Sequence, residues 1–260
     1  MLMLQEKRRI VDINIDIAYP KLDTRGRKRL RQRHFQSLGH AILELGPLWK
    51  RDINESLQLI TEVNGADAVD SAFSEGRGLV LFTAHFGAWE AVVLYIAHHW
   101  PFSVLYKKMG DEALNATIIS GRSRSGAKMI PKNLGIRPFI QTLMRHEAVG
   151  ILPDQNVDER EGVYAPFFGR PASTSPIVSR LALRNSTPTF GVFATRLPKC
   201  RGIRLDFVPM PSDFPSGDDV TDTFTMNQII ERAVRSAPEQ YWWVHRRFKA
   251  QPKGYKNPYD

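Results

Sequence analysis

The chain has 260 residues, of which 42% are hydrophobic and 24% are charged. These proportions are typical of a globular protein with its own hydrophobic core. Lys and Arg number 36 against 27 acidic residues, and this excess of positive charge favours partners that carry phosphates, whether nucleic acid, anionic lipid or a phosphorylated substrate.

Cysteine content and hydropathy exclude further classes. Cys200 is the single cysteine, so an intrachain disulfide and a four-cysteine zinc site are both excluded. No window approaches 18 uninterrupted apolar residues, so we expect no bilayer-spanning helix and any membrane contact to be made from the surface. Without repeats or linkers, residues 1–260 are expected to form one domain that opens with a basic helical segment over about residues 1–62.

The first predicted element is a helix over residues 24–48, where apolar residues recur at helical spacing. Asp52 is expected to cap a second, short helix that runs to Ile60. Residues 21–33 hold seven Lys or Arg and one acidic residue. Such a run is typical of a nucleic-acid contact or of a helix that lies on anionic lipid headgroups.

Strands and helices alternate over the rest of the chain. Residues 78–84 form an apolar run typical of a strand buried in a parallel sheet. Further strands are expected at residues 102–106, 148–152, 189–194 and 203–208, the last of them an outer strand. Helices are expected at residues 87–99, 111–125, 136–145, 176–184 and 221–236. This alternation predicts an α/β fold with a layered, largely parallel central sheet flanked by helices, in which sites gather beyond the carboxyl ends of strands.

A histidine and a carboxylate stand where the first buried strand passes into its helix, in the sequence AHFGAWE at residues 84–90. On one continuous helix, His85 and Glu90 would point about 140° apart. Gly87 permits a bend that would bring the imidazole and the carboxylate together. We therefore predict that His85 is a general base oriented by Glu90, and that amides at the helix start stabilise an oxyanion. The structural alternative is that Glu90 favours the helix dipole and His85 bonds to nearby backbone.

The segment at residues 85–90 resembles the His-Phe-Gly-Asn-Trp-Glu motif of the lipid A late acyltransferases, the lauroyl and myristoyl transferases within the glycerolipid acyltransferase superfamily. The resemblance runs almost end to end. Its other motifs follow in the family's order: YP at 19–20, GRSR at 121–124, PDQ at 153–155, PFFG at 166–169 and APEQYWWVHRRFK at 237–249. The His-x4-Glu spacing alone is a weak signal, but this ordered set is a strong one.

The resemblance implies transfer of a fatty acyl chain from acyl carrier protein, or from coenzyme A, to a hydroxyl of a phosphorylated lipid A precursor. No cofactor, no metal and no nucleic acid are implied, and the expected location is peripheral, on the anionic cytoplasmic face of the bacterial inner membrane. Two features depart from the family: Ala88 replaces the usual Asn, and the N-terminal hydrophobic anchor is missing. A different lipid acceptor (a phosphoinositide mannoside or an amino-acid lipid) and a non-catalytic lipid- or nucleic-acid-binding relative are the alternatives.

Further site residues are expected around this pair. Arg122, which resembles the family's Arg, and Gly87 are expected to contact substrate, Arg122 through phosphate groups. For Arg124 and Lys128 we favour a solvated basic face. Asp154 ends a predicted strand, and we favour a role in binding substrate or orienting an arginine over that of a simple turn residue.

Two neighbouring segments receive structural interpretations. Phe167, Phe168 and Gly169 are expected to form core and turn. Ser173 and Thr174 are expected to cap a helix.

Overall fold

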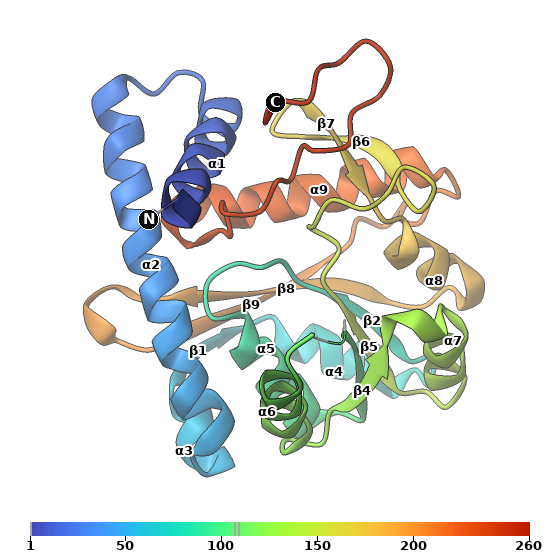
Figure 1. Ribbon diagram of the computed structural model, residues 1–260. Helices are drawn as coiled ribbons and strands as arrows, with labels where there is room; N and C mark the ends of the chain where they lie inside the picture. The colour runs from blue at the N-terminus through green and yellow to red at the C-terminus, as the bar shows by residue number, and fades with distance from the viewer. Residues whose placement is uncertain (1, 107, 109) are drawn as a thin grey trace.

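The computed structural model describes residues 2–106, 108 and 110–260, which form a central sheet with helices on both faces (Figure 1). Within these residues the sheet has seven strands in the order β1-β9-β8-β2-β5-β3-β4. Neighbouring strands are parallel except β8 and β9, which are antiparallel. The predicted α/β class, with a layered and largely parallel sheet, is confirmed.

The strands of the central sheet are β1 (Ile60–Asn64), β2 (Leu79–Phe82), β3 (Phe102–Tyr106), β4 (Lys128–Pro131), β5 (Ala148–Ile151), β8 (Thr189–Arg196) and β9 (Ile203–Pro209). Every residue of β2 and β5 is buried, because both strands lie inside the sheet and are covered on both faces. The prediction that residues 203–208 form an outer strand is wrong. Strand β1 adds beyond β9, and the sequence had assigned its first residue to a helix.

The helices are α1 (Leu2–Ala18), α2 (Thr24–Lys50), α3 (Ile53–Leu57), α4 (Ala66–Ser74), α5 (Trp89–His99), α6 (Glu112–Ser123), α7 (Arg137–Met144), α8 (Ile177–Asn185) and α9 (Asp219–Ser236), with short 3-10 turns η1 (Lys132–Leu134), η2 (Pro198–Cys200) and η3 (Pro238–Gln240). Alternate side chains of β2 point to opposite faces of the sheet. Val80 and Phe82 pack with α1, α7, α8 and α9, whereas Leu79 and Leu81 pack with α4 and α5.

The N-terminal helices are fixed by caps and by the end of the chain. Asp23 accepts a hydrogen bond from the Gly26 amide and caps α2, and Asp52 caps α3 as predicted, although α3 ends earlier than expected. The Asn14 side chain of α1 donates to the carbonyls of Trp243 and His245, at 2.7 and 2.8 Å. In Figure 1 the blue helix α1 accordingly lies beside the red C-terminal segment.

Strands β6 (Val163–Phe167) and β7 (Arg170–Thr174) form an antiparallel hairpin beside α9. The prediction that Ser173 and Thr174 cap a helix is wrong, because both are buried residues of β7. Phe167 is fully buried and Phe168 and Gly169 have positive φ, so the predicted core and turn are confirmed.

None of the helices in the described part of the chain has the length and apolar character that a membrane crossing requires.

Candidate active site

A sharp turn at Gly87 separates the end of β2 from the start of α5. Gly87 has a φ of +56°, and a Cβ atom at this position would lie 1.8 Å from the carbonyl oxygen of Ala194 in β8. Its amide donates to the Gln240 carbonyl at 2.9 Å, and its carbonyl accepts from Arg196 at 2.7 Å. The chain therefore bends at Gly87, as the sequence predicts, because only a glycine lets the backbone approach β8 this closely.

The acid that contacts His85 is Asp154. One Asp154 oxygen accepts from the His85 backbone amide at 2.9 Å, and the other lies 2.8 Å from the ring atom Nδ1. These two bonds fix the ring relative to its own backbone. They also place the proton on Nδ1, so that Nε2 carries the basic lone pair.

The prediction that Glu90 orients the ring of His85 is wrong. The reason is the strand register: Phe82 of β2 pairs with Ile151 of β5, and His85 and Asp154 each follow three residues later. Two parallel neighbouring strands thus deliver both side chains to the same edge of the sheet. This register is the signal that links the two residues across 69 positions.

Glu90 instead holds three helices together. Its carboxylate accepts from Arg122 of α6 at 2.9 and 2.5 Å, from Trp49 of α2 at 3.1 Å and from Trp89 at 3.0 Å. The Glu90 side chain is 5% exposed, and Arg122 is 17% exposed. Burial lowers the pKa of Arg122, but its hydrogen bonds and attraction to Glu90 outweigh this and leave the pKa raised. Arg122 therefore keeps its positive charge in this buried position.

Two tryptophans form a wall around His85. The ring centroid of His85 lies 5.7 Å from that of Trp89 and 6.4 Å from that of Trp242. The two indoles meet edge to face at 5.2 Å, and the Trp242 amide donates to the His85 carbonyl at 2.9 Å. The His85 side chain keeps 21% exposure, so its ring is enclosed but still open to solvent.

A buried charge network lies behind Asp154. Burial raises the pKa of Asp154, but the charge and hydrogen bonds of His85, together with Arg247, outweigh burial and leave the pKa lowered. Arg247 is itself 2% exposed and donates to the Ser173 carbonyl at 2.8 Å and the Thr174 hydroxyl at 2.5 Å. Asp154 is therefore a carboxylate, and its negative charge is available to stabilise an imidazolium at His85.

His245 is a site residue that the sequence analysis did not identify. Its Nε2 accepts from the Asn156 amide at 2.9 Å, two residues beyond Asp154. Burial lowers its pKa to about 4, the attraction of Asp154 notwithstanding, so the ring is neutral at pH 7. The nearest signal in the sequence is its place in the C-terminal motif, one residue before two arginines.

The other predicted residues have mixed outcomes. Arg124 is not a solvated basic side chain, since it donates to the carbonyls of Leu48 and Arg51 at the end of α2 and to the Ser56 hydroxyl in α3. Lys128 is solvent-exposed, as expected, and it pairs with Glu147. Substrate contacts of Arg122 and Gly87 stay predictions.

The amides of Gly87 and Ala88 are bound to the carbonyls of Gln240 and Ala194, so neither is free for an oxyanion. The start of α5 itself, at Trp89 and Glu90, retains the amides that a helix leaves unpaired. The Ala88 side chain is buried in the apolar cluster of α5.

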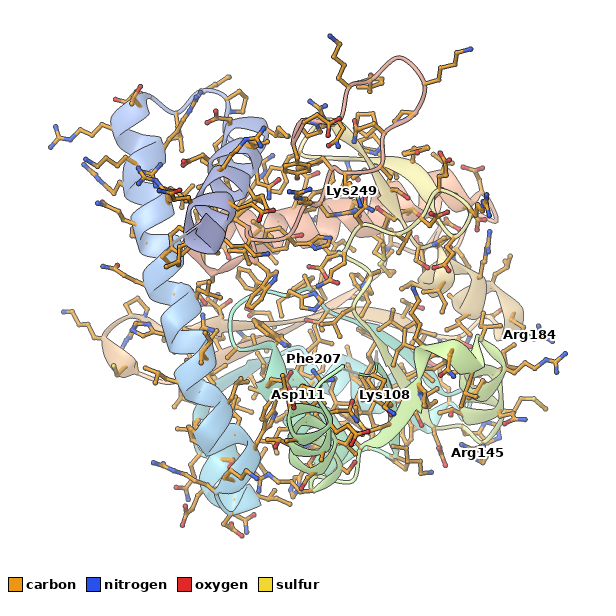
Figure 2. All side chains as sticks on the ribbon, viewed as in Figure 1. Lys108, Asp111, Arg145, Arg184, Phe207 and Lys249 are labelled. Carbon is orange, nitrogen blue, oxygen red and sulfur yellow. The ribbon has the colours of Figure 1, made fainter. Side chains whose placement is uncertain are left out.

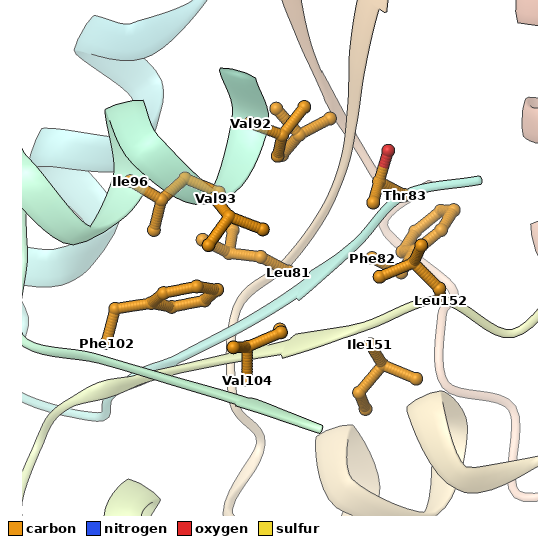
Figure 3. Close-up of a pocket in the computed structure, with 12 residues that line it drawn as sticks. Leu81, Phe82, Thr83, Val92, Val93, Ile96, Phe102, Val104, Ile151 and Leu152 are labelled. Carbon is orange, nitrogen blue, oxygen red and sulfur yellow. The ribbon is translucent and has the colours of Figure 1, made fainter. Parts of the chain in front are cut away.

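A small apolar cavity lies between the sheet and α5, close to the carboxyl end of β2 (Figure 3). Its lining runs from Phe102, Val104 and Ile96 to Thr83 and Leu152, at the strand ends that lead to His85 and Asp154. The volume is about 10 Å³, comparable with a single water molecule. An acyl chain does not fit there in this conformation.

Comparison with known proteins finds the same family that the sequence motifs resemble. Residues 1–250 match the family model of the bacterial lipid A biosynthesis acyltransferases. The chain is 28% identical to the lipid A biosynthesis palmitoleoyltransferase of Escherichia coli K12, over 98% of this chain and 83% of that protein. It is also 26% identical to the lauroyltransferase (98% and 83%) and 22% identical to the myristoyltransferase (98% and 79%) of the same organism.

Proposed function

Because the chain belongs to the bacterial lipid A biosynthesis acyltransferase family and is therefore an acyl transferase, we propose that it moves a fatty acyl chain from an acyl thioester to a hydroxyl of a lipid A precursor, with His85 as general base. The observation that carries this mechanism is the double hydrogen bond from His85 to Asp154. It gives the imidazole a fixed orientation, a defined tautomer and a buried counter-charge.

The reaction proceeds in two steps at Nε2 of His85. The acceptor hydroxyl gives its proton to Nε2 while its oxygen attacks the thioester carbonyl carbon, and Asp154 stabilises the imidazolium that forms. The tetrahedral intermediate then collapses, the carbon–sulfur bond breaks, and the thiolate takes the proton back from Nε2. An ester and a free thiol are the products, and the imidazole returns to its starting state.

Gln155 occupies the position that the acceptor hydroxyl needs. Its side-chain amide nitrogen lies 3.3 Å from Nε2 of His85, as a weak donor to the basic lone pair. An incoming hydroxyl makes a shorter bond in the same place and displaces the amide. Gln155 thus satisfies the base before substrate binds.

The donor in this proposal is acyl carrier protein, with acyl-coenzyme A as the alternative, and the acceptor is a phosphorylated glucosamine lipid. The names of the relatives support lipid A as the acceptor. Ala88, which stands where the family's motif has Asn, removes an amide beside the site and makes the acceptor the point to test first.

Membrane contact is proposed through the first half of α2 and the turn before it. Three arginines of this stretch are paired with carboxylates: Arg27 with Asp16, Arg31 with Asp12 and Arg33 with Glu239. The remaining cations, Lys21, Arg25, Lys28 and Arg29, are exposed. Each contributes up to about 1 kcal/mol near an anionic leaflet, which favours loose, peripheral binding at the cytoplasmic face of the inner membrane. Cosedimentation with anionic and neutral vesicles measures this contact.

The proposed function is tested with His85→Ala. We expect kcat to fall by about 10² or more, because the general base is lost while the backbone bond to Asp154 remains. His98→Ala, an exposed histidine at the end of α5, is the matched control. Mass spectrometry of the acceptor after incubation with defined acyl donors detects the product and compares acyl carrier protein with coenzyme A. Near-normal transfer by folded His85→Ala enzyme would contradict the assignment.

A further inference from the structure

A basic groove lies between α1 and the C-terminal segment. It has a volume of about 350 Å³, within the range of about 300–1,000 Å³ of small-molecule sites. Three cationic side chains line it together with a single carboxylate: Lys7, Arg246, Lys249 and Glu6. In Figure 2, Lys249 lies on the C-terminal segment at the same end of the molecule as α1. The groove therefore carries net positive charge.

The cations of this groove are available to a ligand. Within the part of the chain that the structure describes, the ammonium groups of Lys7 and Lys249 contact no carboxylate, and both residues are exposed. Arg246 pairs with Glu6 at 2.7 Å, but both side chains are half-exposed. Such surface pairs contribute about 1 kcal/mol or less, so a bound anion can replace Glu6 at low cost.

His245 adds a directed donor to the groove. Because its Nε2 accepts from the Asn156 amide, the proton of the neutral ring is on Nδ1. Among the described residues, Nδ1 has no hydrogen-bond partner, and it is not among the buried unpaired atoms. The groove thus offers one N–H donor of fixed direction and three flexible cations, a combination suited to phosphate oxygens.

The groove adjoins the catalytic pair. Asp154 binds His85, Gln155 contacts its Nε2, and the Asn156 amide binds His245 in the groove. Consecutive Cα atoms are about 3.8 Å apart, so the Cα of Asn156 lies within about 7.6 Å of that of Asp154. Three consecutive residues therefore connect the groove to the catalytic pair.

A second basic groove, of about 610 Å³, lies between α1 and α2 and is lined by Arg8, Lys28, Arg31, Gln32, Phe35 and Gln36. Arg31 is neutralised by Asp12. In the described structure, none of its lining residues contacts His85, Asp154 or Gln155. It therefore lacks the connection to the site that the first groove has.

We propose that the groove formed by Lys7, His245, Arg246 and Lys249 binds a phosphate group of the substrate and positions the reacting hydroxyl at His85. The shared chemistry is a phosphate ester, carried either by the acceptor lipid or by the phosphopantetheine arm of the donor. The identity of the bearer rests on the proposed function, but the binding site itself does not.

The test measures binding without turnover, by titration calorimetry. The probes are a short-chain bisphosphorylated lipid A precursor analogue, the same analogue without phosphates, and 4′-phosphopantetheine. The variant is K7Q/K249Q, which removes two exposed charges. The matched control is K253Q/K256Q. It also removes two exposed charges, both from the C-terminal segment that carries Lys249 but outside the groove.

For K7Q/K249Q we expect at least about tenfold weaker binding of one phosphorylated probe, as charge-assisted contacts are lost. The phosphate-free analogue should bind both proteins equally, and K253Q/K256Q should stay within about twofold of wild type. Loss confined to the lipid analogue identifies the acceptor as the bearer, and loss confined to 4′-phosphopantetheine identifies the donor. Unchanged affinity for both phosphorylated probes, or equal loss for the phosphate-free analogue, overturns the site.

These outcomes are independent of the catalytic proposal. If His85→Ala keeps its turnover while K7Q/K249Q loses phosphate binding, the groove stands and the general-base assignment fails. If His85→Ala is inactive while K7Q/K249Q binds as wild type does, the groove fails and the general-base assignment stands.

Discussion

Substitution of Asp154 by Asn isolates the charge behind His85 from the shape of the site. Asn has nearly the same size, and its amide oxygen can accept one of the two bonds that His85 now donates. Its NH₂ group, however, faces the second N–H and favours the ring tautomer with the proton on Nε2. The base is then protonated at the atom that must accept the substrate proton.

The size of the effect follows from the geometry. The carboxylate oxygen is 2.8 Å from Nδ1, and the Asp154 side chain is 2% exposed. Unit charges about 4 Å apart attract by about 4 kcal/mol at an effective dielectric constant near 20. Because about 1.36 kcal/mol corresponds to a factor of ten in rate, losing the stabilised imidazolium lowers kcat by about 10³.

The assay is steady-state acyl transfer by folded enzyme, with Glu90→Gln as the comparison. Glu90→Gln leaves Arg122 buried without its partner, so we expect it to lower the free energy of unfolding by about 3 kcal/mol. We expect its loss in kcat to be smaller than that of Asp154→Asn, because Glu90 does not contact the His85 ring. A larger loss in Glu90→Gln than in Asp154→Asn, at equal folded fraction, would refute the pairing of His85 with Asp154.

Two further predictions concern stability. Gly87→Ala should lower the free energy of unfolding by about 3 kcal/mol or more, because residue 87 has a left-handed backbone conformation and the new methyl group would clash with the Ala194 carbonyl oxygen. Urea titration measures this change. The control is Gly39→Ala in α2, where a new Cβ atom has open space around it and should stabilise the protein slightly. Burial lowers the pKa of His34 from 6.5 to about 4, so between these pH values the unfolded state binds more protons and the free energy of unfolding falls as pH falls. Between pH 7 and 5, His34 should lower the free energy of unfolding by about 2 kcal/mol, and His34→Gln should abolish this contribution. An unchanged pH dependence of stability in His34→Gln would contradict the buried neutral ring.

Elements with a strong local pattern are predictable from the sequence. Strand β3 has the predicted bounds, and α2 begins at the predicted residue because Asp23 caps it. Strand β4 was missed because its four residues, KMIP, lie at the sheet edge and have neither an alternating nor a fully apolar pattern. Helix α1 lies inside the predicted helical segment, but its bounds were not predicted, because its buried face, with Ile10, Val11 and Ile15, is covered by the C-terminal segment and other distant elements.

The positions of three residues of the candidate site were predictable, but their pairing was not, and His245 was not identified. His85, Glu90 and Asp154 all lie where the sequence placed them, at strand ends or in a first helical turn. Their contacts depend on which strands are neighbours, and the order β2-β5 is a property of the whole sheet. A short sequence separation favoured Glu90, whereas the strand register brings Asp154 to the ring. Local spacing therefore identifies the groups, and tertiary pairing assigns their partners.

The five-residue spacing of His85 and Glu90 still has a physical basis without a contact between them. Glu90 lies in the first turn of α5, where its charge suits the helix dipole and its oxygens reach Arg122. It also accepts from the indole of Trp89, and that indole packs against the His85 ring. A displaced carboxylate would free the tryptophan that encloses the base. Glu90 thus positions Trp89 against His85 and fixes the start of α5. The acid at this spacing is therefore explained by its role in holding the site together, and no proton transfer by Glu90 is needed.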